Sequence, residues 1–86
     1  MRLTRRAATE IRQAAAWWAS NRPLAAGAIH EELRRAFALI STQPRVGAAA
    51  RNVALNGVRR VHLSRVHYRL YYRVRSGPSW KPTGLA

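Results

Sequence analysis

The sequence predicts an α+β fold in which an N-terminal helical hairpin packs on a small twisted antiparallel β-sheet. In the first half of the chain, apolar residues recur at the spacing of a helix, whereas residues 58–75 alternate between apolar and polar. The break at 20–23 is short, so the two helices that it joins should form an antiparallel hairpin. The length of 86 residues fits a single domain.

The first helix is expected over residues 7–20. Thr4 stands where an N-cap residue belongs, and the preceding segment 1–4 is interpreted as a short first strand. The apolar residues of the helix repeat at a spacing that places them on one face, which predicts that this face packs against the sheet. This face consists of Ala7, Ile11, Ala15 and Trp18.

A second helix is expected over residues 23–41, because Pro23 is well placed in a first turn. Glu31 and Arg35 form an i, i+4 pair of the favourable polarity. Gly27 costs about 1 kcal/mol relative to alanine inside a helix, which suggests that another backbone approaches it closely. The apolar face of this helix consists of Ala25, Ile29, Leu33, Ala36, Phe37 and Ile40.

The second half of the chain is expected to hold a loop, two strands and a tail. Residues 42–57 are interpreted as the loop, and strands are expected at 58–64 and 67–75, joined by a turn without glycine or asparagine. Pro82 and Gly84 interrupt any alternation near the end, and proline cannot donate to the ladder of a central strand. The chain is therefore divided into a domain at 1–75 and a tail without regular structure at 76–86.

The polar face of the two predicted strands carries the residues most informative about function. Guanidinium groups bind phosphates and carboxylates through paired hydrogen bonds, and an exposed tyrosine can stack on a base. The same face could instead be the solvated side of a half-buried sheet, so both interpretations stay open. The residues of this face are Arg60, His62, Arg69, Tyr71 and Arg73.

The charge of the chain predicts an acidic partner. Fifteen arginines and one lysine stand against three glutamates, a formal net charge of +13 that internal ion pairs cannot neutralise. GC-rich coding explains part of the preference for arginine over lysine, but it does not explain the scarcity of acidic residues. The partner would be a nucleic acid, an anionic membrane or an acidic protein.

Several classes of protein are excluded by what the chain lacks. It has no cysteine and no aspartate, which excludes disulfides, thiolate metal sites and Ser-His-Asp hydrolysis. His30, His62 and His67 do not have the spacing of metal ligands. No apolar run reaches the roughly 20 residues of a membrane span. We therefore expect a cytoplasmic protein with no cofactor, no metal, no membrane association and no small-molecule substrate.

The adjacent residues Trp17 and Trp18 are candidates for partner binding. Trp18 belongs to the apolar face of the first helix, and Trp17 lies about 100° away from it around the helix axis. Trp17 either packs at the edge of the hairpin or anchors a partner segment, since tryptophan is enriched at binding hot spots.

Six segments, in this order, resemble RelE/ParE-type toxins of bacterial type II toxin–antitoxin systems over about residues 2–75. The resemblance implies a helical hairpin packed on a small antiparallel sheet, and an inactive complex with an acidic cognate antitoxin. The segments are Arg2-Leu3-Thr4, Glu10-Ile11 with Trp18, the run from Asn21 to Ala26 followed by Ile40, Pro44-Arg45-Val46-Gly47, Val58-Arg59-Arg60-Val61 and Tyr68-Arg69-Leu70-Tyr71-Tyr72-Arg73-Val74.

Two activities occur among these toxins. RelE-like members cleave ribosome-bound mRNA with a cluster of basic residues, and ParE-like members inhibit DNA gyrase. Because Lys81 is the only lysine and the spacing at 21–26 and 68–74 is nearer the ParE branch, the resemblance implies gyrase inhibition. The alternatives are a RelE-like endonuclease, a basic nucleic-acid-binding module, and a degenerate toxin that only binds its antitoxin.

The resemblance also suggests which residues act, although no catalytic residue is assigned. The target or nucleic acid would be bound by Arg59, Arg60, Arg69, Tyr71 and Arg73, and the antitoxin by Trp17, Trp18, Leu33 and Phe37.

One departure from the family pattern concerns the end of the chain. Such toxins continue past the Ser76-Gly77 turn with an apolar strand, whereas this chain continues with Pro78-Ser79-Trp80-Lys81-Pro82. We therefore expect the last strand to be missing and the edge at 68–74 to be exposed, unless an antitoxin or a second copy covers it.

Overall fold

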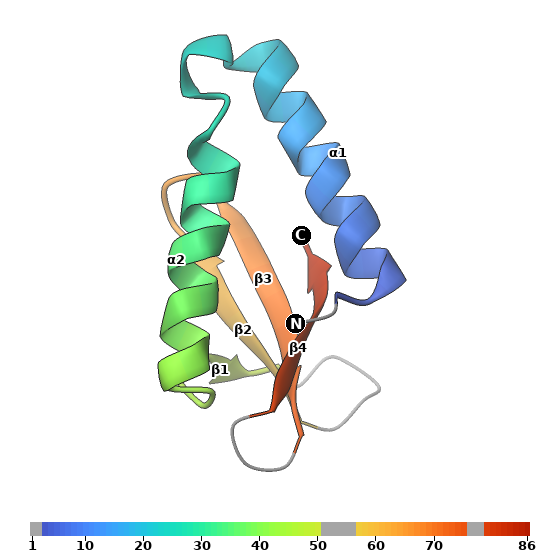
Figure 1. Ribbon diagram of the computed structural model, residues 1–86, viewed down its shortest axis with the longest axis vertical. Coiled ribbons are helices and arrows are strands. Elements are labelled where there is room, and N and C mark those ends of the chain that lie inside the picture. The colour runs from blue at the N-terminus through green and yellow to red at the C-terminus, as the bar shows by residue number, and fades with distance from the viewer. Residues whose placement is uncertain (1–2, 51–56, 76–78) are drawn as a thin grey trace.

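Two helices cover one face of an antiparallel sheet in the computed structural model, which describes residues 3–50, 57–75 and 79–86 (Figure 1). The predicted α+β class and the antiparallel helical hairpin are confirmed. Within the described residues the sheet has four strands in the order β1-β2-β3-β4. The elements are α1 (Arg5–Asn21), a short 3-10 helix η1 (Pro23–Ala25), α2 (Ala28–Thr42), β1 (Ala48–Ala49), β2 (Val58–Leu63), β3 (Tyr68–Val74) and β4 (Trp80–Leu85).

Helix α1 begins where the sequence predicts a cap. The hydroxyl of Thr4 accepts a hydrogen bond from the N–H of Ala7 at 3.1 Å, which satisfies one of the free donors of the first turn. At the other end the N–H of Arg22 donates to the carbonyl of Trp18 at 2.8 Å. The strand expected at 1–4 is not found at its described end, where Thr4 is the helix cap, and residues 1–2 lie outside the described ranges.

Helix α2 is shorter than predicted, because residues 23–25 form the separate helix η1 and Gly27 is the N-cap of α2. The predicted ion pair is present, with 3.3 Å between Arg35 Nη2 and Glu31 Oε1. The expected close approach at Gly27 is wrong, since a Cβ there would meet no atom within 4 Å. The predicted apolar face is confirmed for the buried residues Ile29, Leu33, Ala36 and Ile40.

Strands β2 and β3 form the predicted antiparallel pair, and their turn is made without glycine or asparagine. The N–H groups of Val66 and His67 both donate to the carbonyl of Leu63, at 3.1 and 2.8 Å. His67 adopts the left-handed conformation, with φ of 59°. Histidine is one of the few residues other than glycine that is enriched in this region, so it takes the position where such turns usually place glycine.

The segment 42–57 is not entirely a loop. Ala48 and Ala49 form strand β1, which pairs with Arg60 and Arg59 of β2. Alanine has low strand propensity, and a run of three alanines shows no alternation, so the pattern did not predict this strand. Residues 51–56 of the expected loop lie outside the described ranges.

The prediction of a tail is wrong, because strand β4 pairs with β3 along residues 80–85 and the folded domain extends beyond residue 75. The carbonyl of Pro82 accepts a hydrogen bond from the N–H of Thr4 at 3.2 Å, on the side away from β3. The N–H and C=O of one strand residue point to the same side, so the N–H that proline lacks would also face the edge. Pro82 therefore removes no ladder hydrogen bond from this edge strand.

An irregularity in β4 explains why its sequence shows no alternation. Leu85 stands opposite Leu70 and Pro82 stands opposite Tyr72, so β4 has one more residue than β3 between these pairs. Such a bulge shifts the period of two by one residue. Leu85 and Pro82 are consequently both buried, and β4 covers the edge of β3 that was expected to be exposed.

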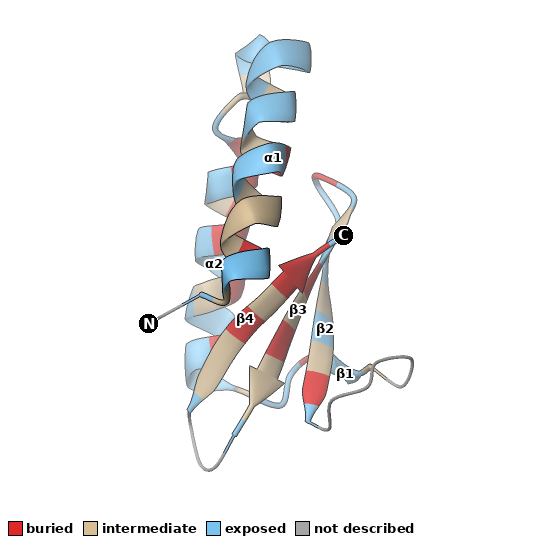
Figure 2. Cartoon of the chain, turned by 90° about the vertical axis from the view of Figure 1, so that its right-hand side faces the viewer, coloured by how far each residue is buried: buried red, intermediate tan, exposed pale blue. Residues whose placement is uncertain are grey.

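The core lies between the helices and the facing side of the sheet, where β3 and β4 carry buried residues (Figure 2). Trp80 of β4 packs edge-on against Phe37 of α2 and Tyr72 of β3, with ring centroids 5.5 and 5.8 Å apart. Among the described residues, no helix is long and apolar enough to span a membrane.

Candidate functional site: a basic sheet face and an aromatic pocket

The register of β2 and β3 gathers the predicted cationic residues on one face of the sheet. Arg60 stands opposite Tyr71, and His62 stands opposite Arg69. Residues directly opposite each other in an antiparallel pair project to the same face, and residues two apart along a strand share it. Arg73 therefore belongs to the same face. Figure 2 shows the helices on one side of the sheet, and because Leu70 and Tyr72 are buried in the core on that side, the cationic residues project to the opposite side.

Strand β4 adds Lys81 to this face, because Lys81 stands opposite Arg73. The sequence prediction missed this lysine because it assigned residues 76–86 to a tail. The apolar–basic–apolar order of Trp80, Lys81 and Pro82 was the one local signal of a strand. We call six of the residues on this side the basic sheet face: Arg60, His62, Arg69, Tyr71, Arg73 and Lys81.

Arg59 does not belong to the basic sheet face, although it was predicted to bind the target together with residues of that face. It stands opposite the buried residue Tyr72, and its side chain turns to the segment that precedes β1. Arg59 Nη1 donates to the carbonyl of Gly47 at 2.6 Å and to that of Arg45 at 3.2 Å. Arg59 therefore ties this segment to β2.

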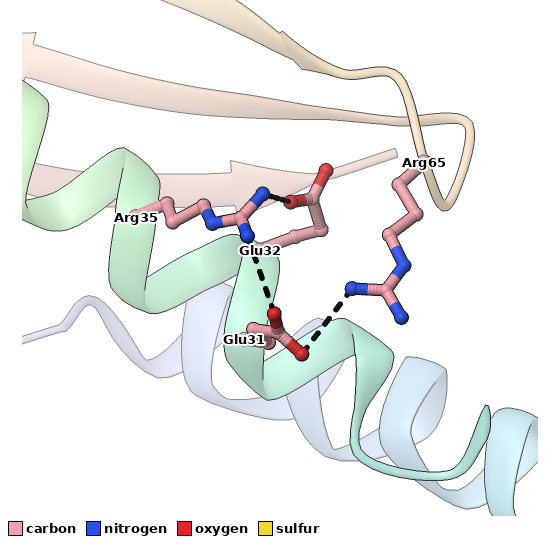
Figure 3. A network of polar contacts seen from close by, with 4 residues as sticks. All are labelled: Glu31, Glu32, Arg35 and Arg65. Carbon is pink, nitrogen blue, oxygen red and sulfur yellow. Dashed lines mark hydrogen bonds and ion pairs between the residues drawn. The ribbon is translucent and has the colours of Figure 1, made fainter.

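The acidic residues of the chain all lie on the helices and none on the sheet. Glu10 is in α1, 3.5 Å from Arg6, and Glu31 and Glu32 are in α2. Figure 3 shows that Glu31 and Glu32 surround Arg35. The chain has no other aspartate or glutamate, so no acidic side chain lies on the basic sheet face to offset its positive potential.

A surface pocket of about 510 Å³ lies between the end of α1 and the turn that joins β2 to β3. Trp17 and Trp18, predicted to bind the antitoxin, come together here with ring centroids 5.9 Å apart in an edge-to-face arrangement. We call this site the aromatic pocket. It is lined by Trp17, Trp18, Arg22, Arg65, Val66, His67 and Tyr68.

The other two residues predicted to contact an antitoxin lie elsewhere. Leu33 is buried in the core, because the apolar face of α2 is turned to the sheet. Phe37 is partly buried and packs against Trp80. The pocket residues from 65–68 were not predicted, since their proximity to Trp17 depends on how the turn folds back against α1.

Comparison with known proteins agrees with this architecture. A search of curated proteins and a search of solved structures give no significant match. The family model for the ParE toxin of the type II toxin–antitoxin system parDE matches residues 1–78, which is most of the chain. The helical hairpin followed by an antiparallel sheet is the arrangement that the resemblance implied. The chain belongs to the ParE toxin family of type II toxin–antitoxin systems.

Proposed function

We propose that this toxin inhibits DNA gyrase through the basic sheet face. The observation that supports the proposal is the single face formed by Arg60, Arg69, Arg73 and Lys81 around Tyr71, with no acidic side chain among them. Gyrase works on DNA, so its substrate complex offers phosphates to guanidinium groups and bases to an aromatic ring. The target implies a cytoplasmic location.

We further propose that the antitoxin implied by the family is acidic. The toxin carries a formal net charge of +13, and its three glutamates already have arginine neighbours on the helices or the β2–β3 turn. An acidic segment bound to the surface would lower the repulsion among the remaining arginines, which otherwise weakens the compact state.

A second candidate is ribosome-dependent mRNA cleavage. One observation favours it: the register places Lys81 beside Arg73, so the basic sheet face does contain a lysine, which the sequence prediction had assigned to a tail. Cationic groups on one face can stabilise the charge that develops on a phosphate during transfer. A basic module that binds nucleic acid without catalysis would use the same face.

The test combines two assays on the purified full chain. Gyrase is supplied with relaxed plasmid and ATP, and supercoiling and trapped cleavage complexes are measured. Ribosomes programmed with mRNA are assayed for cleavage in parallel. We expect inhibition of gyrase and intact mRNA. A polyarginine peptide at equal total charge is the matched control, because a polycation can inhibit gyrase by coating the DNA.

Three results would contradict the proposal. Cleaved mRNA with unaffected gyrase would favour the endonuclease. Inhibition no stronger than that by polyarginine would favour a basic nucleic-acid-binding module. A cognate antitoxin that carries no net negative charge, or that fails to reverse the effect, would contradict neutralisation by an acidic antitoxin.

A further inference from the structure

We propose that the aromatic pocket anchors an acidic peptide segment that carries a bulky apolar side chain between carboxylates. The proposal rests on the proposed function in that the acidic antitoxin would supply this segment. The proposal goes further by naming the site that holds the segment and the chemistry that binds it. This site shares no residue with the basic sheet face.

The apolar part of the pocket is suited to one large side chain. Val66, which is 3% exposed, and the rings of Trp18 and Tyr68 contribute apolar wall, while Trp17 is left 48% exposed. A half-exposed indole beside a pocket has the properties of a hot-spot residue, because a partner can bury its remaining surface at little entropic cost.

The indole of Trp17 lies in an ordered part of the chain. Its ring packs edge-on against Trp18, and the side-chain amide of Asn21 donates to the carbonyl of Trp17 at 2.9 Å. A preorganised wall of this kind reduces the cost of binding. Leu24, in the helix η1 that follows α1, is fully exposed and offers more apolar surface close in sequence to Trp17 and Arg22.

The charged part of the pocket selects an anion. Arg22 and Arg65 line it together with His67. Arg65 Nη1 lies 3.2 Å from Glu31 Oε2, but this carboxylate is shared with Arg35 (Figure 3). The guanidinium groups at the pocket therefore exceed the carboxylate charge near them, and carboxylates that flank an apolar anchor can bind them in a bidentate manner.

The charge of the chain favours an acidic peptide in the pocket over a second copy of the chain or a nucleic acid strand. A second copy of the chain would bring another +13 to the same place, which repels it. A nucleic acid strand is better matched by the basic sheet face, which runs across β2, β3 and β4, than by a pocket whose Arg65 already has Glu31 as a neighbour.

The experiment uses the full chain and a short fluorescent peptide in which glutamates alternate with leucine and phenylalanine. Binding is followed by anisotropy over a range of salt concentrations. A second peptide, with serines in place of the apolar residues, reports purely electrostatic attraction to the chain. We expect the apolar peptide to bind about tenfold tighter or more, as a buried hot-spot side chain requires.

Two pocket variants and two controls locate the binding. Trp17→Ala should weaken the apolar peptide about tenfold or more, and Arg22→Ala should weaken it about fivefold and reduce its salt dependence. Leu39→Ala and Arg12→Ala remove an exposed apolar residue and an exposed arginine that do not line the pocket, so both variants should bind as the wild type does. Circular dichroism of each variant confirms that it is folded.

Equal binding of the two peptides, or normal binding of the apolar peptide by Trp17→Ala, would overturn the proposal. So would a single-stranded oligonucleotide that binds tighter than the apolar peptide and loses its binding in Trp17→Ala. The fourth contrary outcome is a dimer of the chain that dissociates in Trp17→Ala. Because these assays contain no gyrase, ribosome or antitoxin, their result is separate from that of the proposed function. A toxin without effect on gyrase can still bind the peptide, and a gyrase inhibitor can fail to bind it.

Discussion

The carboxylate of Glu10 in α1 accepts a hydrogen bond from the backbone N–H of Leu85 in β4 at 3.0 Å. The neighbouring residue Ala86 exchanges two hydrogen bonds with Arg69 of β3, so the N–H of Leu85 faces away from the sheet. Thr4 binds the same edge through the carbonyl of Pro82. The first helix thus satisfies polar groups of an edge strand that would otherwise be free to pair with another chain.

Removal of this carboxylate should destabilise the domain. Glu10→Ala leaves the N–H of Leu85 without its partner, and we expect a loss of about 1–3 kcal/mol in the free energy of unfolding. Glu10→Gln keeps an acceptor oxygen and should lose less. Urea unfolding followed by circular dichroism measures both. Arg6→Ala is the control, because it removes only the exposed ion pair between Arg6 and Glu10 at 3.5 Å. If Arg6→Ala lost as much stability as Glu10→Ala, the hydrogen bond from Leu85 to Glu10 could not be the cause of the loss.

The hydroxyl of Tyr72 should matter for stability, whereas that of Tyr71 should not. The Tyr72 hydroxyl donates to the carbonyl of Pro44 at 2.8 Å and accepts from the N–H of Gly47 at 2.9 Å. Tyr72→Phe leaves both groups unsatisfied and should cost about 1–3 kcal/mol. Tyr71→Phe, on the basic sheet face, should change stability by less than about 0.5 kcal/mol. Faster hydrogen exchange of the Gly47 amide in Tyr72→Phe but not in Tyr71→Phe would confirm the role of the Tyr72 hydroxyl. Equal losses of stability in the two variants would contradict it.

Substitution of alanine should destabilise the domain much more at Gly47 than at Gly27. A Cβ at Gly47 would lie 2.7 Å from the carbonyl oxygen of Arg60 and 2.7 Å from the hydroxyl of Tyr72, so Gly47→Ala should cost about 1–3 kcal/mol or more. A Cβ at Gly27 would meet nothing within 4 Å, and its φ of −81° suits any residue. Gly27→Ala should therefore change stability by less than about 1 kcal/mol. Thermal unfolding compares the two, and a smaller effect at Gly47 would show that the 43–47 segment can move aside.

Charge reversal on the basic sheet face should weaken gyrase inhibition without unfolding the chain. Arg60→Glu and Arg69→Glu change exposed side chains, and each should weaken gyrase inhibition about tenfold or more, as the loss of a charge pair at an interface does. Arg12→Glu, on α1, makes the same change in net charge and should have an effect of about twofold or less. Equal effects of all three would mean that only total charge counts.

The same variants report on direct contact with DNA. If the basic sheet face binds duplex DNA through about four phosphates, the logarithm of the binding constant should fall with the logarithm of salt concentration at a slope of about −3.6. Loss of one contact in Arg60→Glu should reduce the magnitude of that slope by about one. A slope unchanged by Arg60→Glu would place the contact on another surface.

The helices and the central hairpin were predictable because their signals are local. The apolar spacing that places Ile29, Leu33 and Ile40 on one face follows from the helix period, and the alternation at 68–74 follows from the strand period. The N-cap at Thr4 needs only the residues of its own first turn. In each case the physical cause acts between residues that are close together in the sequence.

The basic sheet face was predicted only in part, because membership in a face depends on register. Alternation along the two strands predicted Arg60, Arg69, Tyr71 and Arg73. The pairing of β2 with β3 places them side by side on one face. Arg59 was predicted from the family resemblance to bind the target, but it is adjacent to Arg60, and adjacent strand residues point to opposite sides. Lys81 was missed because its strand contains a proline and a bulge.

By itself, the sequence determined two amphipathic helices, a pair of alternating strands and a large positive charge, since period and composition are properties of the chain alone. Only the tertiary structure decided that residues 80–85 form a strand, because the edge position of Pro82 and the contact between Glu10 and Leu85 join opposite ends of the chain. It also decided the aromatic pocket, whose walls come from a helix end and a distant turn. Both features depend on which segments meet in space, and no local pattern of residues specifies that.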